Sequence, residues 1–328
     1  MEMLLSDMIN MRSSVVRFIL SLFLCVASLA PLSAVELGDI KLNFITAVGV
    51  GGSEVREFVF SAPNASFSDW NPLDNRISEL VWSNYASPLV SVRAELTWKN
   101  LFSFAEFKTA VPMLCGRTED FDFMTDSSGD ISQYSQHENY LDKNFSFHGG
   151  IFYIIPSRVF PLQIGLGFLY QNRKWSAFNG YTQYPPSGQA WTGSEVKQNV
   201  QGNIISYEQS ILAGSLEFRI PILRESEGGV MLELSFCPAL GFIETLDSHY
   251  LRNKQFADKI HNRFSFSFSS IGWYKNFYMC IGGSVTPVLV GTTSSGAIGS
   301  SASGMTKSST TYSGTTWWSW TVLFGCRF

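Results

Sequence analysis

Charged residues and long apolar runs are both scarce in this chain of 328 residues. Only 15% of the residues are charged, whereas about a quarter are charged in an ordinary soluble domain. Beyond residue 30, no uninterrupted apolar run reaches the ~18 residues that a membrane-spanning helix needs. Aromatic residues, in contrast, make up 15% of the chain. Low charge, many aromatic residues and no spanning helix together favour a transmembrane β-barrel.

Cysteine and net charge are also low. The net charge of −4 argues against a nucleic-acid partner. The cysteines beyond the N-terminal segment match no zinc-binding spacing, so we expect no metal site. Disulfides are possible in an oxidising exterior, but we interpret these residues as small apolar parts of the barrel wall. They are Cys115, Cys237, Cys280 and Cys326.

The N-terminal segment has the pattern of a secretory signal peptide. Arg12 and Arg17 precede an apolar run over residues 18–30, and Leu32-Ser33-Ala34 offers a small-residue cleavage site. We therefore assign residues 1–34 to a signal peptide and residues 35–328 to a single barrel domain.

Strand-like segments alternate with short turns and long loops along the mature chain. This asymmetry is typical of outer-membrane barrels, which have short periplasmic turns and long extracellular loops. The pattern predicts an all-β fold, a ten-stranded antiparallel transmembrane β-barrel with an extended extracellular rim. The longest early loop is expected at about residues 116–141. The predicted strands cover residues 41–60, 76–98, 101–114, 145–155, 162–178, 203–222, 230–243, 262–271, 277–290 and 315–328.

The last predicted strand carries the sharpest signal, because alternate residues from Trp318 to Phe328 are all apolar. A soluble β-sandwich would also explain alternation, but it would not explain the signal peptide and the loop asymmetry. An even strand number puts both termini on the periplasmic side. The outer ends of the acidic segments described next then share one extracellular rim.

Two pairs of titratable residues fall at that rim. Asp120 and Asp122 are two residues apart, so both carboxylates point the same way in extended backbone, and their repulsion should raise one pKa. Asp247 and His249 also share a face, and the carboxylate would fix the tautomer of the imidazole. If the pairs face each other, His249 can take a proton from a water that an opposite Asp orients. The arrangement predicts hydrolysis without a covalent nucleophile.

Four segments of the chain resemble the omptin family of outer-membrane endopeptidases, and the likeness covers essentially the whole mature chain. The segments are Ile77-Ser-Glu-Leu-Val-Trp82, residues 119–128, Tyr170-Gln171 with Arg173 and Lys174, and Asp247-Ser-His249-Tyr250. The resemblance implies an aspartic-type endopeptidase, a hydrolase of the cell outer membrane that acts on peptide and protein substrates. It also implies catalytic roles for Asp120, Asp122, Asp247 and His249, and it makes Ser135 and His137 loop residues that line the cleft.

The same resemblance implies cleavage next to basic residues, through acidic groups in the first specificity pocket. One acidic position falls on Glu57, and the second falls on Thr245, or on Glu244 if the alignment slips by one residue. A further acidic position of the cleft falls on Gln133. Loss of negative charge at Thr245 and Gln133 would weaken a preference for basic residues, since a charge-assisted pair is stronger than a neutral hydrogen bond.

A lipid requirement is a further implication of the resemblance. Omptins bind lipopolysaccharide through basic residues on the outer wall, and Lys174 matches one such position, with Tyr170 beside it. A second basic position falls on Ser210, so part of the phosphate site is missing. We expect no cofactor other than lipopolysaccharide or another outer-membrane lipid, and we expect a monomer.

A different class of function stays open at this point. The same barrel could be non-catalytic, acting as an adhesin or as a structural or pore protein. A wide aqueous pore is disfavoured, because large channels need about 16 strands. An adhesin predicts binding that survives loss of His249, whereas an endopeptidase predicts peptide turnover that does not.

Overall fold

The structure is a computed structural model that describes residues 35–328 apart from 62–74, 124–128, 157–161, 226, 239–240, 262–263 and 302–303. The predicted signal peptide, residues 1–34, lies outside the described residues. Within the described part, no helix has the length and apolar character needed to cross a membrane.

Antiparallel strands make up almost the whole described fold, and only one 3-10 turn, η2 (Tyr250–Arg252), interrupts them near the site. The first half of the chain forms β1 (Val35–Leu37), β2 (Ile40–Phe60), β3 (Arg76–Trp98), β4 (Leu101–Ala110), β5 (Met113–Phe123), β6 (Ile131–Ile154) and β7 (Gln163–Gln183). The second half forms β8 (Gln198–Asn199), β9 (Asn203–Arg224), β10 (Gly228–Cys237), β11 (Gly241–His249), β12 (Lys254–His261), β13 (Ser265–Tyr274), β14 (Phe277–Gly296) and β15 (Thr306–Arg327).

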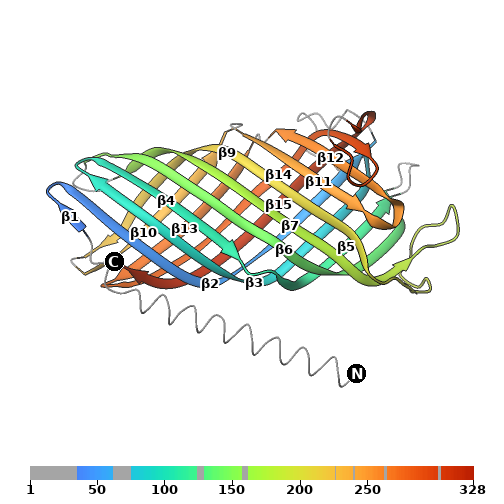
Figure 1. The fold of residues 1–328 in the computed structure, drawn as a ribbon, viewed down its shortest axis with the longest axis horizontal. Coiled ribbons are helices and arrows are strands. Elements are labelled where there is room, and N and C mark those ends of the chain that lie inside the picture. The colour runs from blue at the N-terminus through green and yellow to red at the C-terminus, as the bar shows by residue number, and fades with distance from the viewer. Residues whose placement is uncertain are drawn as a thin grey trace, which may run out of the picture.

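The sheet closes on itself into a barrel. β15 pairs with β2 from Tyr312↔Phe60 down to Arg327↔Ile45, so the last long strand lies beside the first. The backbones of Phe44 and Phe328 exchange two hydrogen bonds, 3.0 and 2.8 Å, at the end of this seam. Closure pairs the first and last long strands of the described chain with each other, and a closed barrel is the form in which strands cross a bilayer. Figure 1 shows the tilted strands of the barrel, with the C-terminus at one end and β5, β11 and β12 toward the other.

Side chains alternate between the outer wall and the lumen in the half of the barrel near the C-terminus. In β15, Trp318 and Phe324 are exposed on the wall, whereas Trp317 and Leu323 are buried inside. The same half carries the exposed apolar residues Leu96, Phe107, Phe147, Ile151, Leu166, Phe168, Phe268 and Ile281. An apolar outer band around a polar lumen is the pattern of a membrane-spanning barrel.

The other half of the barrel corrects the sequence-based strand limits. The loop expected over residues 116–141 is largely strand, since β5 runs to Phe123 and β6 begins at Ile131. Asp247 and His249 lie on β11 and not in a loop, and β12 begins five residues after His249. Above the apolar band both faces of a strand meet water. The side chains of such a strand therefore need not alternate between apolar and polar residues. The strands therefore continue into a rim that the sequence pattern could not distinguish from loops.

Breaks in the hydrogen-bond ladder separate the two halves of several strands. β4 ends at Ala110 and β5 begins at Met113, on either side of Val111 and Pro112. Proline has no N–H to donate to the ladder, so this pair marks a natural interruption. β10 and β11, and likewise β12 and β13, are separate strands, and the segment between each two includes residues outside the described part. The residues beyond the breaks form the rim that holds the candidate site.

Stacked aromatic rings fill the lumen below the rim. Trp82, Trp175 and Tyr207 are fully buried, and their ring centroids are 5.8 to 6.4 Å apart in stacked geometry. Such pairs contribute about 0.5–1.5 kcal/mol each beyond the area they bury. This cluster gives the rim a rigid floor.

Candidate active site

The first acidic pair comes from β5. Asp120 lies opposite Leu80 of β3 and Ser135 of β6, so its side chain is fixed in the middle of a three-strand sheet. Burial, and then repulsion from Asp122, raise the pKa of Asp120 to about 7. Burial also raises the pKa of Asp122, while the cation of Arg252 opposes the rise. Asp120 therefore gains or loses its proton in the neutral pH range.

The second pair comes from β11. The Oδ2 atom of Asp247 lies 2.6 Å from Nε2 of His249, and the Asp247 residue is only 3% exposed. Burial opposes the charged imidazole, but the carboxylate of Asp247 outweighs it, so the pKa of His249 is raised. The Phe256 ring packs edge-on against the imidazole with a centroid distance of 5.6 Å. Asp247 and Phe256 together fix the plane of the ring.

The two pairs act on each other across the cleft, although β9, β7 and β6 separate their strands in the sheet. Asp120 contributes to the raised pKa of His249, and His249 in turn lowers the pKa of Asp120. One carboxylate oxygen on each side, Oδ1 of Asp120 and Oδ1 of Asp247, is buried and has no hydrogen-bond partner among the described residues. Buried polar atoms are rarely left unpaired, so these oxygens mark the place where a water or substrate would bind.

Glu57 of β2 faces the lumen and is 3% exposed. Arg56, the neighbour that might have paired with it, points to the outer wall and binds Glu54 and Glu79 instead, at 2.8 and 3.0 Å. Burial, followed by repulsion from Asp247, Asp258 and Asp120, raises the pKa of Glu57 well above its usual value. Glu57 is therefore a cleft carboxyl group and not a surface ion pair.

Thr245 and Glu244 have opposite orientations on β11. Thr245 is 5% exposed on the same face as Asp247, whereas Glu244 is exposed and lies 3.5 Å from Lys259 on the outer wall. Of the two alternatives from the sequence, Thr245 is therefore the cleft residue. Its hydroxyl donates a hydrogen bond of 2.6 Å to Oδ2 of Asp258.

Sequence reasoning missed Arg252 and Asp258. Arg252 ends the turn η2, three residues after His249, and its charge acts on Asp120, Asp122 and His249. Asp258 lies directly opposite Thr245 in the β11–β12 hairpin. Asp258 could have been identified from a hairpin turn around residues 250–253, because such a turn brings residue 258 beside residue 245.

Ser135 and His137 are not loop residues, which corrects the expectation from the sequence. Both lie on β6 and are buried, at 5% and 2% exposure. Ser135 Oγ lies 2.9 Å from Nε2 of His137, and Nδ1 of His137 lies 2.5 Å from the carbonyl oxygen of Asn179. Burial lowers the pKa of His137, so this imidazole is neutral near pH 7.

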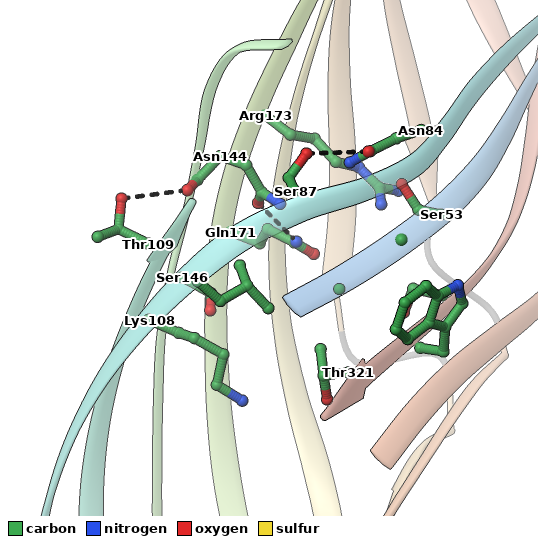
Figure 2. A pocket seen from close by; sticks show the side chains of 15 residues that line it. Ser53, Asn84, Ser87, Lys108, Thr109, Asn144, Ser146, Gln171, Arg173 and Thr321 are labelled. Atoms are coloured by element: carbon green, nitrogen blue, oxygen red, sulfur yellow. Dashed lines mark hydrogen bonds between the residues drawn. The ribbon is translucent and has the colours of Figure 1, made fainter. Parts of the chain in front are cut away.

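A small polar chamber of about 80 Å³ lies inside the barrel between the apolar band and the rim. Figure 2 shows Arg173 and Asn84 near its upper side, the bonded pair Gln171 and Asn144, and Lys108 lower down. Arg173 points inward, and its guanidinium lies 4.9 Å from the ring centroid of Trp317 and binds Gln209 at 2.7 Å. Arg173 is thus part of the lumen, unlike its neighbour Lys174.

Tyr170 and Lys174 lie near other polar and aromatic residues of β6 and β9. The Tyr170 ring is 6.0 Å from the Phe145 ring, and Lys174 pairs in register with Lys143 and Glu208. Lys143 binds Glu208 at 2.8 Å, and Ser210 accepts a hydrogen bond of 2.7 Å from Asn172. Lys143 is a cation at this position that the sequence analysis did not identify.

The closed sheet and the buried carboxylates define an outer-membrane β-barrel with an acidic cleft at one end. The profile of the Omptin family matches residues 40–282, so the chain belongs to the omptin family. Membership of this family supports an outer-membrane protease.

One solved structure in particular shares this fold. The crystal structure of the outer-membrane protease OmpT from Escherichia coli matches with a TM-score of 0.72 at 15% identity, covering 91% of this chain and 99% of OmpT. The attachment invasion locus protein Ail of Yersinia pestis matches with a TM-score of only 0.23 at 12% identity, covering 87% of this chain and 98% of Ail. Curated protein sequences gave no match.

Proposed function

We propose that this protein is an outer-membrane endopeptidase built on a ten-stranded barrel, with β4–β5, β10–β11 and β12–β13 each counted as one interrupted strand. The observation that carries the proposal is the pair of buried carboxylate oxygens on Asp120 and Asp247 that lack partners on either side of His249. We assign the catalytic work to Asp120, Asp122, Asp247 and His249. The mechanism is of the aspartic type, with His249 as base, and needs no covalent nucleophile.

His249 begins the reaction as a general base. Its Nε2 contacts Asp247, so Nδ1 is the ring nitrogen that takes a proton from the attacking water. The water oxygen bonds to the scissile carbonyl carbon, and the carbonyl electron pair moves to the oxygen. The imidazolium then gives its proton to the amide nitrogen as the C–N bond breaks. The products are a carboxylic acid and an amine, and Asp247 stabilises the imidazolium between the two steps.

The Asp120–Asp122 pair orients the water and stabilises the tetrahedral intermediate. Two carboxylates this close hold one proton between them near neutral pH, as the raised pKa of about 7 for Asp120 indicates. The protonated carboxyl can donate a hydrogen bond to the developing oxyanion, while the ionised one accepts from the water. The site thus requires a neutral imidazole and one retained acid proton at the same time.

Replacing Arg252 with glutamine is expected to move the pH–rate profile to higher pH. The profile of kcat/KM should be bell-shaped near neutral pH, because activity falls when His249 gains its proton and also when the Asp pair loses its own. The Arg252 cation lowers the pKa of Asp120, Asp122 and His249, so its removal raises all three. Peptide hydrolysis by wild type and R252Q between pH 5 and 9 checks this; a shift to lower pH would contradict it.

Ser135→Ala is expected to keep most of the activity of the refolded barrel toward a peptide containing arginine. The contact between Ser135 and His137 resembles a nucleophile and its base, so this variant tests the competing serine mechanism. Cleavage of the peptide by wild type, followed by mass spectrometry of the products, tests the proposed function itself. No cleavage by wild type would reject the endopeptidase, and loss of about 10³-fold or more in S135A would reject the water mechanism.

We propose that substrates are peptides and proteins cleaved next to basic residues, with Glu57 and Thr245 in the first specificity pocket. Glu57 supplies a buried carboxyl group that has no bond to Arg56 and that a substrate cation would hold in its ionised form. Thr245 supplies a hydroxyl in place of a second carboxylate at its own position. A buried carboxyl group in a substrate pocket is stabilised by a cation, which favours arginine or lysine.

We propose that the protein requires a lipid and that Tyr170 and Lys174 bind it. Lys143 and Lys174 together would give two cations to a phosphate group, although Glu208 already binds Lys143. Lipopolysaccharide or another anionic outer-membrane lipid would meet the aromatic pair Tyr170 and Phe145 with its acyl chains. We further propose a monomer whose signal peptide, residues 1–34, is removed on export.

A further inference from the structure

A second buried carboxylate lies in the specificity pocket, supplied by β12. Asp258 is 4% exposed and lies opposite Thr245 in the hairpin register. The Thr245 hydroxyl donates to its Oδ2 atom at 2.6 Å, whereas its Oδ1 atom is buried without a hydrogen-bond partner. The hydrogen bond fixes the carboxylate on the lumen side, and the Thr293 and Ser313 hydroxyls also act on this group by lowering its pKa.

Glu57 of β2 is close enough to Asp258 for the two carboxyl groups to repel each other. The negative charge of Asp258 is among the causes that raise the pKa of Glu57. Repulsion between like charges is mutual, so ionised Glu57 also destabilises ionised Asp258. Oε2 of Glu57 is also buried without a hydrogen-bond partner. Two buried acids that act on each other therefore each have one oxygen without a short hydrogen bond from the described residues.

The floor between the two acids is Tyr207. The Tyr207 ring belongs to the stacked aromatic cluster, and both Glu57 and Asp258 act electrostatically on its hydroxyl. Gln209 holds the floor in place by donating to the hydroxyl groups of Tyr207 at 3.4 Å and Thr315 at 3.2 Å. An aromatic floor under two carboxylates suits a long side chain with an apolar stem and a cationic end.

The remaining charged groups around the pocket do not neutralise it. Asp247 and Asp120 add to its negative charge. Arg56 is committed to Glu54 and Glu79 on the outer wall, and Arg173 binds Gln209 below the floor. Burial, opposed by the Thr245 hydroxyl, and repulsion from Asp247 raise the pKa of Asp258 to about 6. A cationic side chain in this pocket would therefore favour the ionised form of both carboxyl groups.

We propose that Asp258 is a specificity residue that acts with Glu57 to bind the cationic end of an arginine or lysine side chain of the substrate. In this chain the second acid of the pocket stands on β12, where Thr245 holds it by a hydrogen bond, and not on β11. This inference rests on the proposed endopeptidase function for its kinetic test, and a separate binding test makes it independent of turnover.

Asp258→Asn measures the charge with little change of shape. The asparagine oxygen can still accept from Thr245, while the negative charge is gone. The substrates are two peptides that differ only in arginine or citrulline at the cleavage position, because citrulline replaces the guanidinium with a neutral urea. The ratio of kcat/KM for the arginine peptide to that for the citrulline peptide is expected to fall about 30-fold in D258N. A ratio within about twofold of wild type would overturn the proposal.

The matched control exchanges the two side chains. The double variant T245D/D258T keeps one carboxylate and one hydroxyl in the same hairpin pair, on exchanged strands. It is expected to recover most of the arginine preference that D258N loses, and the resistance of each folded barrel to heat in detergent verifies folding. If D258N does not fold, the double variant decides, because loss of preference in a folded T245D/D258T barrel would contradict a pocket formed by charge at this pair.

Binding of arginine amide to an inactive barrel separates the two proposals. Calorimetry with the His249→Ala barrel needs no turnover, so it measures the affinity of the pocket for arginine amide even if wild type cleaves neither peptide. The dissociation constant is expected to rise at least about tenfold in H249A/D258N relative to H249A. Equal binding to both barrels would reject the role of Asp258, whereas weaker binding without any cleavage by wild type would reject only the endopeptidase.

Discussion

Replacing His249 with alanine is expected to lower kcat for peptide hydrolysis by about 10⁴-fold, at the upper end of what a general base contributes. Imidazole is the group among the four whose ordinary pKa lies nearest neutral pH, so it can take a proton from water and return it to the leaving amine. Asp247 lies 2.6 Å from the imidazole and raises its pKa. Alanine at position 249 leaves no base at this point of the cleft. Single-turnover hydrolysis of an arginine peptide by the refolded barrel measures the loss.

His261→Ala is the matched control for this substitution. His261 is exposed at the end of β12, the strand that pairs with β11, and it takes no part in the cleft. Both variants should migrate on gels as folded, heat-modifiable barrels. H261A should keep its turnover, and an H249A barrel that is folded and nearly as fast as wild type would end the assignment of His249.

Replacing Asp120 with alanine is expected to lower kcat by about 10³-fold, comparable to the loss of an oxyanion donor. The alanine variant lacks both the proposed hydrogen bond from Asp120 to the tetrahedral intermediate and the proton that Asp120 would share with Asp122. Asp120→Asn should retain more activity, because the amide can still donate to the oxyanion. Its profile should lack the fall at high pH, since that fall reports the loss of the Asp120 proton, whose pKa is about 7.

Glu119→Ala controls for the loss of an acidic residue from the same strand. Glu119 accepts from the Tyr134 hydroxyl at 2.9 Å and lies 3.1 Å from Arg117, on the face of β5 opposite to Asp120. E119A should leave kcat close to wild type. Equal losses in D120A and E119A would mean that β5 is only a structural support for the rim.

The barrel could be predicted from sequence in its membrane-spanning half. Alternation in the segment from Trp318 to Phe328 predicts a strand because lipid on one side and a polar lumen on the other impose a period of two. The sequence pattern predicts a loop over residues 116–141, where no lipid imposes the period, although β5 and β6 continue there as strands. For the same reason the pattern predicts a loop at Asp247 and His249, which lie on β11.

Spacing two residues apart was enough to predict which titratable residues share a face of their strand. Asp247 and His249 share a face of β11, as alternation requires, and the structure places them in contact. Asp258 could not be assigned in the same way, since its partner Thr245 is 13 residues away. That contact depends on the register of the hairpin, which the turn at Asn253 in left-handed conformation sets.

Arg252 shows a further limit of the sequence pattern. It lies in the turn η2, where the backbone no longer alternates, so the direction of its side chain does not follow from its position after His249. Its effect on three titratable groups across the cleft depends on their distances in the folded rim. Only coordinates reveal that a cation belongs to this acidic site.

The double variant H249A/D120A tests most directly whether both sides of the cleft act on one water. Residues that act as a unit give losses that do not multiply, because the first substitution already removes the step that the second one serves. We expect kcat of the double variant to lie within about tenfold of H249A alone. Losses that multiply to about 10⁷-fold would show two independent contributions and contradict a shared water.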